Sequence, residues 1–220
     1  MRELAPGVWQ LAGLLPNVVN TYLIGDVLVD AGSRHDTGRI LKQLRGREVR
    51  AHSLTHAHAD HQGASHAVCE RLGIPFWVGE ADVAAAEDPR VMLAEMPDHF
   101  MARASYKAFH GPGHPVDRPL REGDEVAGFA VLEVPGHSPG HLAFWRESDR
   151  VLILGDVLTN MDTITLLPGL HEPKTFWTPD PARNRESARR LGQLRPELVC
   201  FGHGKPLRDA QKFEAFCASL

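Results

Sequence analysis

Residues 54–63, LTHAHADHQG, carry His56, His58, Asp60 and His61 within six positions. Imidazole and carboxylate groups are ligands that suit Zn, Fe and Mn in proteins. Side chains two positions apart on an extended segment point to one face, so His56 and His58 are expected side by side. Asp60 and His61 follow where the chain must turn. Such a group can form a catalytic metal site with a position open to water. The stretch alone leaves open whether the site holds one ion or two.

Three more candidate ligands lie further along the chain, each at the end of an apolar segment. His137 follows in VPGH, Asp156 ends VLILGD, and His203 lies in LVCFGHG. Each is a lone polar side chain where a predicted strand stops and a glycine-containing loop begins, and loops of this kind often carry binding residues. This shared context predicts that all three join the ligands of the first stretch.

Apolar alternation and helical spacing predict the elements that position these residues. Strands are expected within 7–13, 20–25, 27–32, 49–56, 74–79, 125–137, 141–156 and 197–204, and helices within 37–46, 63–73, 181–194 and from about 208. Residues 87–118 break this order and hold three of the five Met. We expect one domain over residues 1–220, in which 87–118 is an insertion that caps the active site or packs on the core.

The composition limits the classes of function. The chain has 220 residues, 43% of them hydrophobic, and a formal net charge of −4, as in soluble globular proteins. It shows no basic patch for nucleic acid, no apolar run that could cross a membrane, and no apolar segment of a secretory signal at its start. Cys69, Cys200 and Cys217 are scattered, which predicts buried thiols in a reducing, cytoplasmic environment.

The order of the candidate ligands resembles that of the metallo-β-lactamase-fold hydrolases, including glyoxalase II-like and lactonase-like enzymes with two metals. The segment VLVDAG, which contains Asp30, also matches an early strand and aspartate of that family. The resemblance covers nearly the whole chain. It implies a four-layer αββα sandwich, of the α/β (α+β) class, with the site at one edge of the two sheets.

The resemblance also implies how the ligands divide between two ions. The first ion takes His56, His58 and His137, and the second takes Asp60, His61 and His203. Asp156 would bridge the two, while Asp30 would orient a ligand without binding metal itself. Zinc is the first expectation for both positions, and iron or manganese would suit the same donors.

Two adjacent ions can share a water and lower its pKa towards 7. The resemblance therefore implies a hydroxide that attacks the carbonyl of an ester, thioester or lactone in a small-molecule substrate, with Asp60 orienting it and moving its proton. The alternative is a persulfide dioxygenase-like oxidoreductase, with a single iron held by His56 or His58, His137 and Asp156. β-Lactamase activity is less favoured because zinc β-lactamases lack the bridging aspartate. Phosphodiesterase activity is also less favoured.

Comparison within the family narrows the substrate only in part. Glutathione thioesterases carry a basic C-terminal helical region, whereas the 17 residues after His203 supply only Lys205, Arg208 and Lys212. Acyl-homoserine lactonases carry a tyrosine after the bridging aspartate, and both tyrosines here precede it. Apolar residues of 87–118 and the loop 160–181 are expected to form the pocket walls, which favours a moderately hydrophobic substrate. The apolar candidates in the insertion are Met92, Leu93, Met96, Phe100, Met101, Tyr106 and Phe109.

The other histidines are assigned by their position. His35, His52 and His66 are expected to be surface or packing residues, and His141 to support the loop that presents His137. Four more histidines could contact substrate, namely His99, His110, His114 and His171. The sequence leaves the oligomeric state open, with a homodimer as one option.

Overall fold

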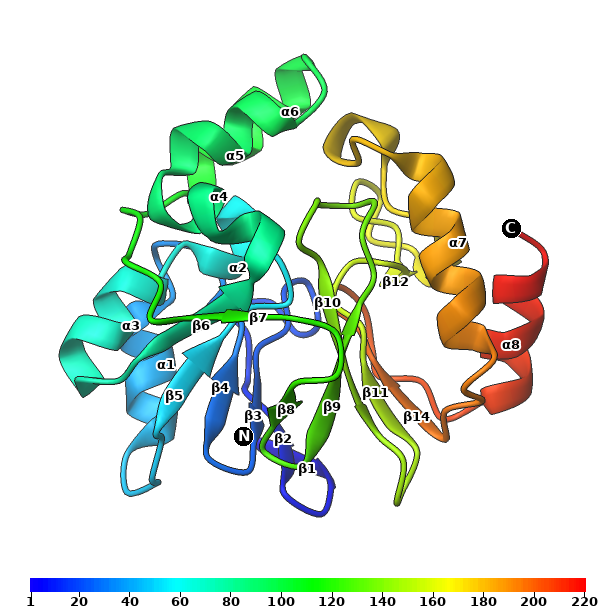
Figure 1. The fold of residues 1–220 in the computed structure, drawn as a ribbon, viewed down its shortest axis with the longest axis horizontal. Coiled ribbons are helices and arrows are strands. Elements are labelled where there is room, and N and C mark those ends of the chain that lie inside the picture. Colours follow the sequence, from blue (N-terminus) through cyan, green and yellow to red (C-terminus); the bar gives the residue numbers. More distant parts are fainter.

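Two mixed β-sheets lie between helices that cover their outer sides (Figure 1). The computed structural model describes residues 1–220. In the seven-stranded sheet, neighbours follow chain order, with antiparallel pairing from the first strand to the fourth and parallel pairing from there on. Its strands are β1 (Arg2–Ala5), β2 (Val8–Gln10), β3 (Tyr22–Ile24), β4 (Val27–Val29), β5 (Ala51–Ser53), β6 (Phe76–Gly79) and β7 (Arg118–Leu120).

The five-stranded sheet has the order β14-β11-β10-β9-β8, in which only β11 and β14 pair in parallel. Its strands are β8 (Glu125–Val126), β9 (Phe129–Glu133), β10 (Leu142–Arg146), β11 (Val151–Ile153) and β14 (Leu198–Cys200). A separate two-stranded ribbon joins β12 (Thr159–Met161) to β13 (Pro168–His171).

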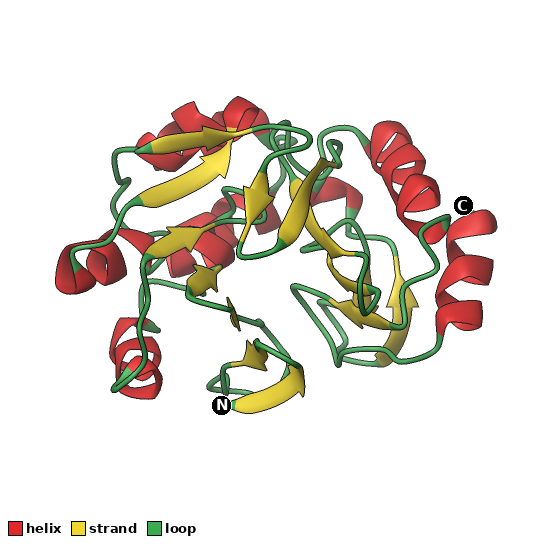
Figure 2. Cartoon of the chain, turned by 60° about the horizontal axis from the view of Figure 1, so that its bottom comes forward, coloured by secondary structure: helices red, strands yellow, loops and turns green.

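The helices lie outside the strands, as Figure 2 shows in red around yellow. They are α1 (Thr37–Leu44), α2 (Ala59–Gln62), α3 (Ser65–Leu72), η1 (Glu80–Asp82), α4 (Val83–Glu87), α5 (Pro89–Glu95), α6 (Phe100–Phe109), η2 (Thr175–Trp177), α7 (Pro181–Gly192) and α8 (Ala210–Ala218). None of them is long and apolar enough to span a membrane.

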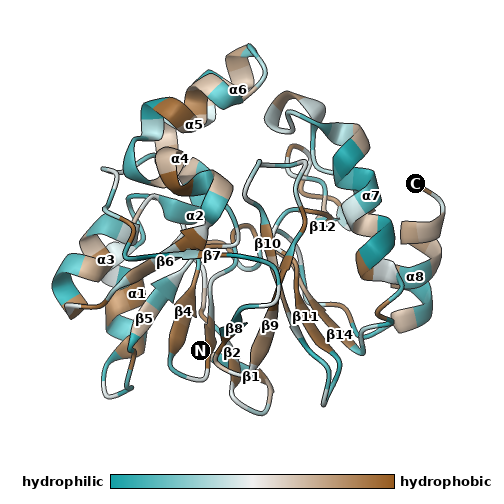
Figure 3. Cartoon of the chain, in the orientation of Figure 1, coloured by the Kyte–Doolittle hydropathy of each residue, from teal (hydrophilic) through white to brown (hydrophobic).

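Strand alternation explains why the sheets are covered on both faces. In β3, Tyr22 and Ile24 face the core between the sheets, while Leu23 packs with the apolar faces of α1 and α3. In β11, Val151 and Ile153 enter the same central core, while Leu152 packs under α7 and α8. Figure 3 shows brown strands with teal on the outer helices. The predicted αββα sandwich is confirmed.

Some local predictions differ from the structure. Strand β5 ends at Ser53, so His56 and His58 lie in a loop, and Asp60 and His61 lie in helix α2 instead of a turn. Its partner β4 stops at Val29 because Asp30 takes a left-handed conformation with φ of 59°. Strands β1, β7, β12 and β13 lie outside the predicted strands. The helix predicted to end at Gly73 does so, with Gly73 left-handed at φ 63°.

Candidate metal centre

The seven candidate ligands meet at one end of the sandwich. Four of them lie in the segment that follows β5 of the seven-stranded sheet, and three lie in loops that follow β9, β11 and β14 of the other sheet. Their ligand atoms form three groups, each with all atoms within 4.8 Å of one another. The groups are His56, His58 and His137; Asp60, His61 and His203; and His56, His61 and Asp156.

Asp156 stands between the first two groups. Its Oδ2 lies 3.0 Å from His203 Nε2, 3.6 Å from His61 Nε2 and 3.7 Å from His137 Nε2. Asp60 joins the second group, with Oδ2 3.3 Å from His203 Nε2 and 3.9 Å from His61 Nε2. One carboxylate therefore reaches both groups, while the other belongs to the second group alone.

Hydrogen bonds through Nδ1 set the orientation of four of the five candidate imidazole ligands. His61 Nδ1 lies 3.0 Å from Asp30 Oδ2, and His137 Nδ1 lies 3.0 Å from Thr178 Oγ1. His56 Nδ1 is 3.0 Å from Thr55 Oγ1, and His203 Nδ1 donates to the carbonyl of Val18. Because Nδ1 is engaged in all four rings, the Nε2 atoms are directed into the centre, as in metal sites whose ligands are held by outer partners.

The inward-facing atoms lack partners within the protein. Nε2 of His56, His61 and His137 and Oδ1 of Asp156 are buried and form no hydrogen bond. Buried polar atoms are nearly always paired, so this group of orphaned atoms calls for a ligand. Nitrogen and oxygen donors at this spacing fit divalent ions such as zinc or iron. The residues present therefore fit the metals that the sequence predicts.

The electrostatics of the centre suit cations. Burial lowers the pKa of His58 to about 4 and holds the pKa values of His56 and His137 well below normal, so these rings are neutral and can bind metal. Burial acts in the same direction on His203, but Asp156 and Asp60 overcome it and raise its pKa to about 10. Two carboxylates among buried imidazoles thus give a region that favours positive charge.

Asp30 has the role expected from the resemblance, since its Oδ2 holds His61 Nδ1. Its carboxylate also accepts hydrogen bonds from the backbone N–H and the hydroxyl of Thr55. The left-handed backbone of Asp30 is a conformation that costs an L-residue about 1–2 kcal/mol. That strain is retained where the residue orients a candidate ligand.

Asp82 is a supporting residue that sequence reasoning missed. Its buried Oδ2 accepts hydrogen bonds from the N–H of Ala57 at 2.9 Å and from Ser138 Oγ at 2.7 Å. Its Oδ1 accepts from the N–H of Gly140 at 2.6 Å. Ala57 lies between His56 and His58, and Ser138 follows His137. A single carboxylate therefore joins the two loops that carry the first group, and no local motif around Asp82 signals this.

Two further features support Asp156. The ring of His141, expected to support its loop, accepts a hydrogen bond from the N–H of Asp156 through Nε2 at 3.3 Å. Gly202 packs so closely that a Cβ atom there would lie 2.0 Å from Asp156 Oδ1 and 2.7 Å from His61 Cε1. Only glycine leaves space for the carboxylate.

A solvent-open pocket with an empty volume of about 780 Å³ leads to the centre. Five of the seven candidate ligands line it, while His56 and His61 lie deeper. The insertion contributes Met96, Ser105 and Phe109, and the loop 160–181 contributes Met161 and Trp177 among others. Trp177 Nε1 donates to Ser105 Oγ at 3.1 Å, which joins the two walls.

Other predicted pocket residues lie elsewhere. Met92 is buried in the core under α4 to α6, and Phe100 is exposed. None of the four histidines considered for substrate contact lines the pocket: His99, His110, His114 and His171. His52 is buried and packs as expected, bonded to Leu28 O and Ser65 Oγ. Lys174, which the sequence did not single out, lines the pocket and pairs with Asp162.

Comparisons with known proteins all point to one family. Residues 14–203 match the family described as the Metallo-beta-lactamase superfamily. Probable metallo-hydrolase YflN of Bacillus subtilis is 29% identical over 93% of this chain and 86% of its own length. A hydroxyacylglutathione hydrolase of Cereibacter sphaeroides is 31% identical over 84% of this chain, which spans only 59% of that protein. The structure of TTHA1623 in a di-iron-bound form has 32% identity and a TM-score of 0.64, covering 95% of this chain and 96% of that one.

Proposed function

This chain belongs to the metallo-beta-lactamase superfamily and is a metal-dependent hydrolase, and from that premise we propose that it uses two divalent ions to hydrolyse an ester, thioester or lactone. The observation that carries the proposal is the pair of buried ligand groups that share Asp156 at the base of a pocket with apolar walls. Two bound ions would supply Lewis acidity and a water of lowered pKa. Zinc is the first candidate, and iron would suit the same donors.

The proposal gives each candidate ligand a role. His56, His58 and His137 would hold one ion, Asp60, His61 and His203 the other, and Asp156 would contact both. The side chain of Asp60 is 28% exposed, whereas that of Asp156 is 7% exposed, so Asp60 is the carboxylate more open to the pocket. We infer that Asp60 would orient an attacking water and accept its proton.

The pocket walls support a substrate with an apolar acyl or ring portion. Val18, Val19, Met96, Phe109, Met161 and Trp177 line the pocket. Burying a methylene group there would contribute about 0.8 kcal/mol. Lys174 adds one cation to the lining. In this proposal residues 87–118 serve as a cap within the single domain, because they supply one wall.

A matched substrate panel tests the proposal. It contains esters, thioesters and lactones with short and long acyl chains, with a β-lactam and a phosphodiester as comparisons, and the metal content is measured on the same sample. We expect at least two ions per chain, two of them at the centre, and a kcat/KM that rises with acyl length. Turnover of the phosphodiester alone would refute it. A single iron with oxygen uptake on a persulfide would instead support the dioxygenase.

Variants test the site itself. His58→Ala is expected to abolish hydrolysis and to reduce bound metal, because His58 belongs to the first group. His35→Ala is the matched control, since His35 is an exposed histidine outside the pocket. Full activity with unchanged metal content in His58→Ala would show that the ligand assignment is wrong.

A further inference from the structure

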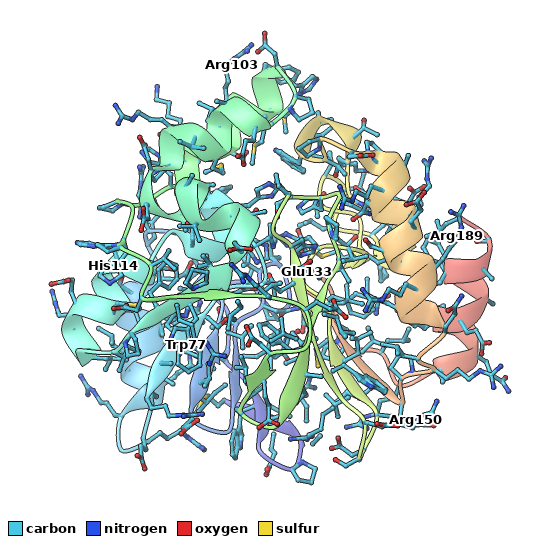
Figure 4. All side chains as sticks on the ribbon, viewed as in Figure 1. Trp77, Arg103, His114, Glu133, Arg150 and Arg189 are labelled. Atoms are coloured by element: carbon cyan, nitrogen blue, oxygen red, sulfur yellow. The ribbon has the colours of Figure 1, made fainter.

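A second cluster of metal-ligating side chains lies outside the pocket. His66 and Glu70 on α3 and His114 in the segment before β7 have ligand atoms within 4.8 Å of one another. None of the three lines the pocket of the candidate metal centre. In Figure 4, His114 lies on the outer side of the molecule, beside the helices that flank the seven-stranded sheet.

The positions of the three residues in the fold bring their side chains together. His66 and Glu70 are four positions apart on a helix, so they lie on one face of α3. His114 Nδ1 lies 3.0 Å from His66 Nδ1. Around a tetrahedral zinc ion, two nitrogen ligands at the usual bond length are about 3.3 Å apart. The two imidazoles are therefore already near the separation that a shared ion requires.

Close backbone packing holds His114 against α3. It ends the stretch HGPGH, residues 110–114, whose two glycines pack against neighbouring backbone. A Cβ atom on Gly111 would lie 2.0 Å from Gly63 O, and one on Gly113 would lie 1.9 Å from Glu87 O. The N–H of His114 also donates to Ala86 O at 3.2 Å. Because neither glycine can be replaced without displacing backbone, the position of the His114 backbone is set by the fold.

The chemistry of the cluster selects the class of ion. The two imidazoles prefer Zn²⁺, Ni²⁺ or Cu²⁺ to Mg²⁺ or Ca²⁺, and the carboxylate can bind any of these ions. His66 and His114 are half-buried and Glu70 is exposed, so water can take the remaining position. Burial, followed by the proximity of His66, lowers the pKa of His114, which keeps this ring in its neutral, metal-binding form near pH 7.

We propose that His66, Glu70 and His114 form a peripheral site for a divalent transition-metal ion, distinct from the candidate metal centre. The ion would link helix α3 to the end of the 87–118 insertion. It would thereby fix the segment that packs against Gly63, directly after the helix α2 that carries Asp60 and His61.

The test compares metal content in the whole protein and in variants that leave the central site intact. After equilibrium dialysis against buffered Zn²⁺, wild-type protein is expected to hold one ion per chain more than His66→Gln/His114→Gln, with equal hydrolytic activity. Glu70→Gln is expected to weaken the additional binding event at least tenfold in a calorimetric titration. His35→Gln, which changes an exposed histidine elsewhere, should retain the wild-type content.

Two results would overturn the proposal. Equal zinc content in wild type and in a folded double variant would show that the imidazoles only bond to each other. Mg²⁺ competing as strongly as Zn²⁺ for the additional site would exclude an imidazole-based site. If the double variant did not fold, Glu70→Gln alone would decide, because an unchanged titration would refute the role of the carboxylate.

Discussion

Asp82 offers a sharp test of how the loops of the candidate metal centre are held. In Asp82→Asn, one carboxylate oxygen becomes an NH₂ group. The oxygens of Asp82 accept hydrogen bonds from two backbone N–H groups, of Ala57 and Gly140, and from the hydroxyl of Ser138. The Ser138 hydroxyl can rotate and accept, but a backbone N–H cannot. In either orientation of the amide, one buried N–H therefore faces an NH₂ group and loses its partner.

The magnitude follows from that single lost partner. A buried donor without an acceptor costs about 1–3 kcal/mol, and bonds to an uncharged oxygen are weaker than those to a carboxylate. Burial raises the pKa of Asp82, so removing the charge offsets part of this loss. We expect the free energy of unfolding of the metal-free protein to fall by about 2 kcal/mol. Because the loops of His56, His58 and His137 loosen, metal affinity should fall by about 10–100-fold, the range typical of supporting residues.

Two measurements separate the effects. Denaturant unfolding of the metal-free protein gives the change in stability, and competition with a chromophoric chelator gives the metal affinity. Asp124→Asn is the control, because this carboxylate accepts hydrogen bonds from Arg121 and Arg118 and bonds to neither ligand loop. Wild-type metal affinity in a destabilised Asp82→Asn would show that Asp82 serves folding alone. Unchanged stability would refute the hydrogen-bond argument itself.

Three other perturbations have defined outcomes. Gly202→Ala should lower activity at least 100-fold with loss of bound metal, because its Cβ would overlap Asp156 Oδ1. Gly38→Ala is the control and should keep both, because the space around Gly38 is open. Equal activity of the two variants would contradict the packing argument. Burial lowers the pKa of His52 to about 4, below its unfolded value. The free energy of unfolding should therefore fall by about 3 kcal/mol as pH falls from about 6.5 to 4. A His52→Gln variant with the wild-type pH dependence of unfolding would exclude this. Removing metal with a chelator should abolish activity and lower Tm, and added Zn²⁺ should restore both; a Tm that does not respond to metal would argue against binding at the centre.

The layered fold and the convergence of the seven ligands could be predicted because each signal is local. Apolar strands stop at Asp156 and His203, and both residues lie where expected, next to one another. The supporting residues carry no such signal. Asp82 follows β6 within the short helix η1, and its three partners come from two segments far away in the chain. Such a role exists only after the sheets have packed.

The pocket walls were predicted only in part, for a physical reason. Helical spacing indicates that Met92 and Phe109 lie on apolar helix faces. It does not show whether such a face packs in the core or lines a solvent-open pocket. The structure places Met92 in the core and Phe109 on the wall. The loop between β5 and α2 also differed from the predicted strand, because the end of a strand depends on its partner, and β4 ends at Val29, just before Asp30.

The ligands come from both sheets, four from one side and three from the other. A bound pair of ions would therefore add a link between two halves that also meet through the apolar core and through hydrogen bonds such as those of Asp82. Each half alone holds an incomplete set of donors, so tight binding requires both to be folded and docked. Through this linkage, an ion concentration 1,000 times the dissociation constant would add about 4 kcal/mol to stability. The lifetime of the folded enzyme would then follow the supply of free metal around it.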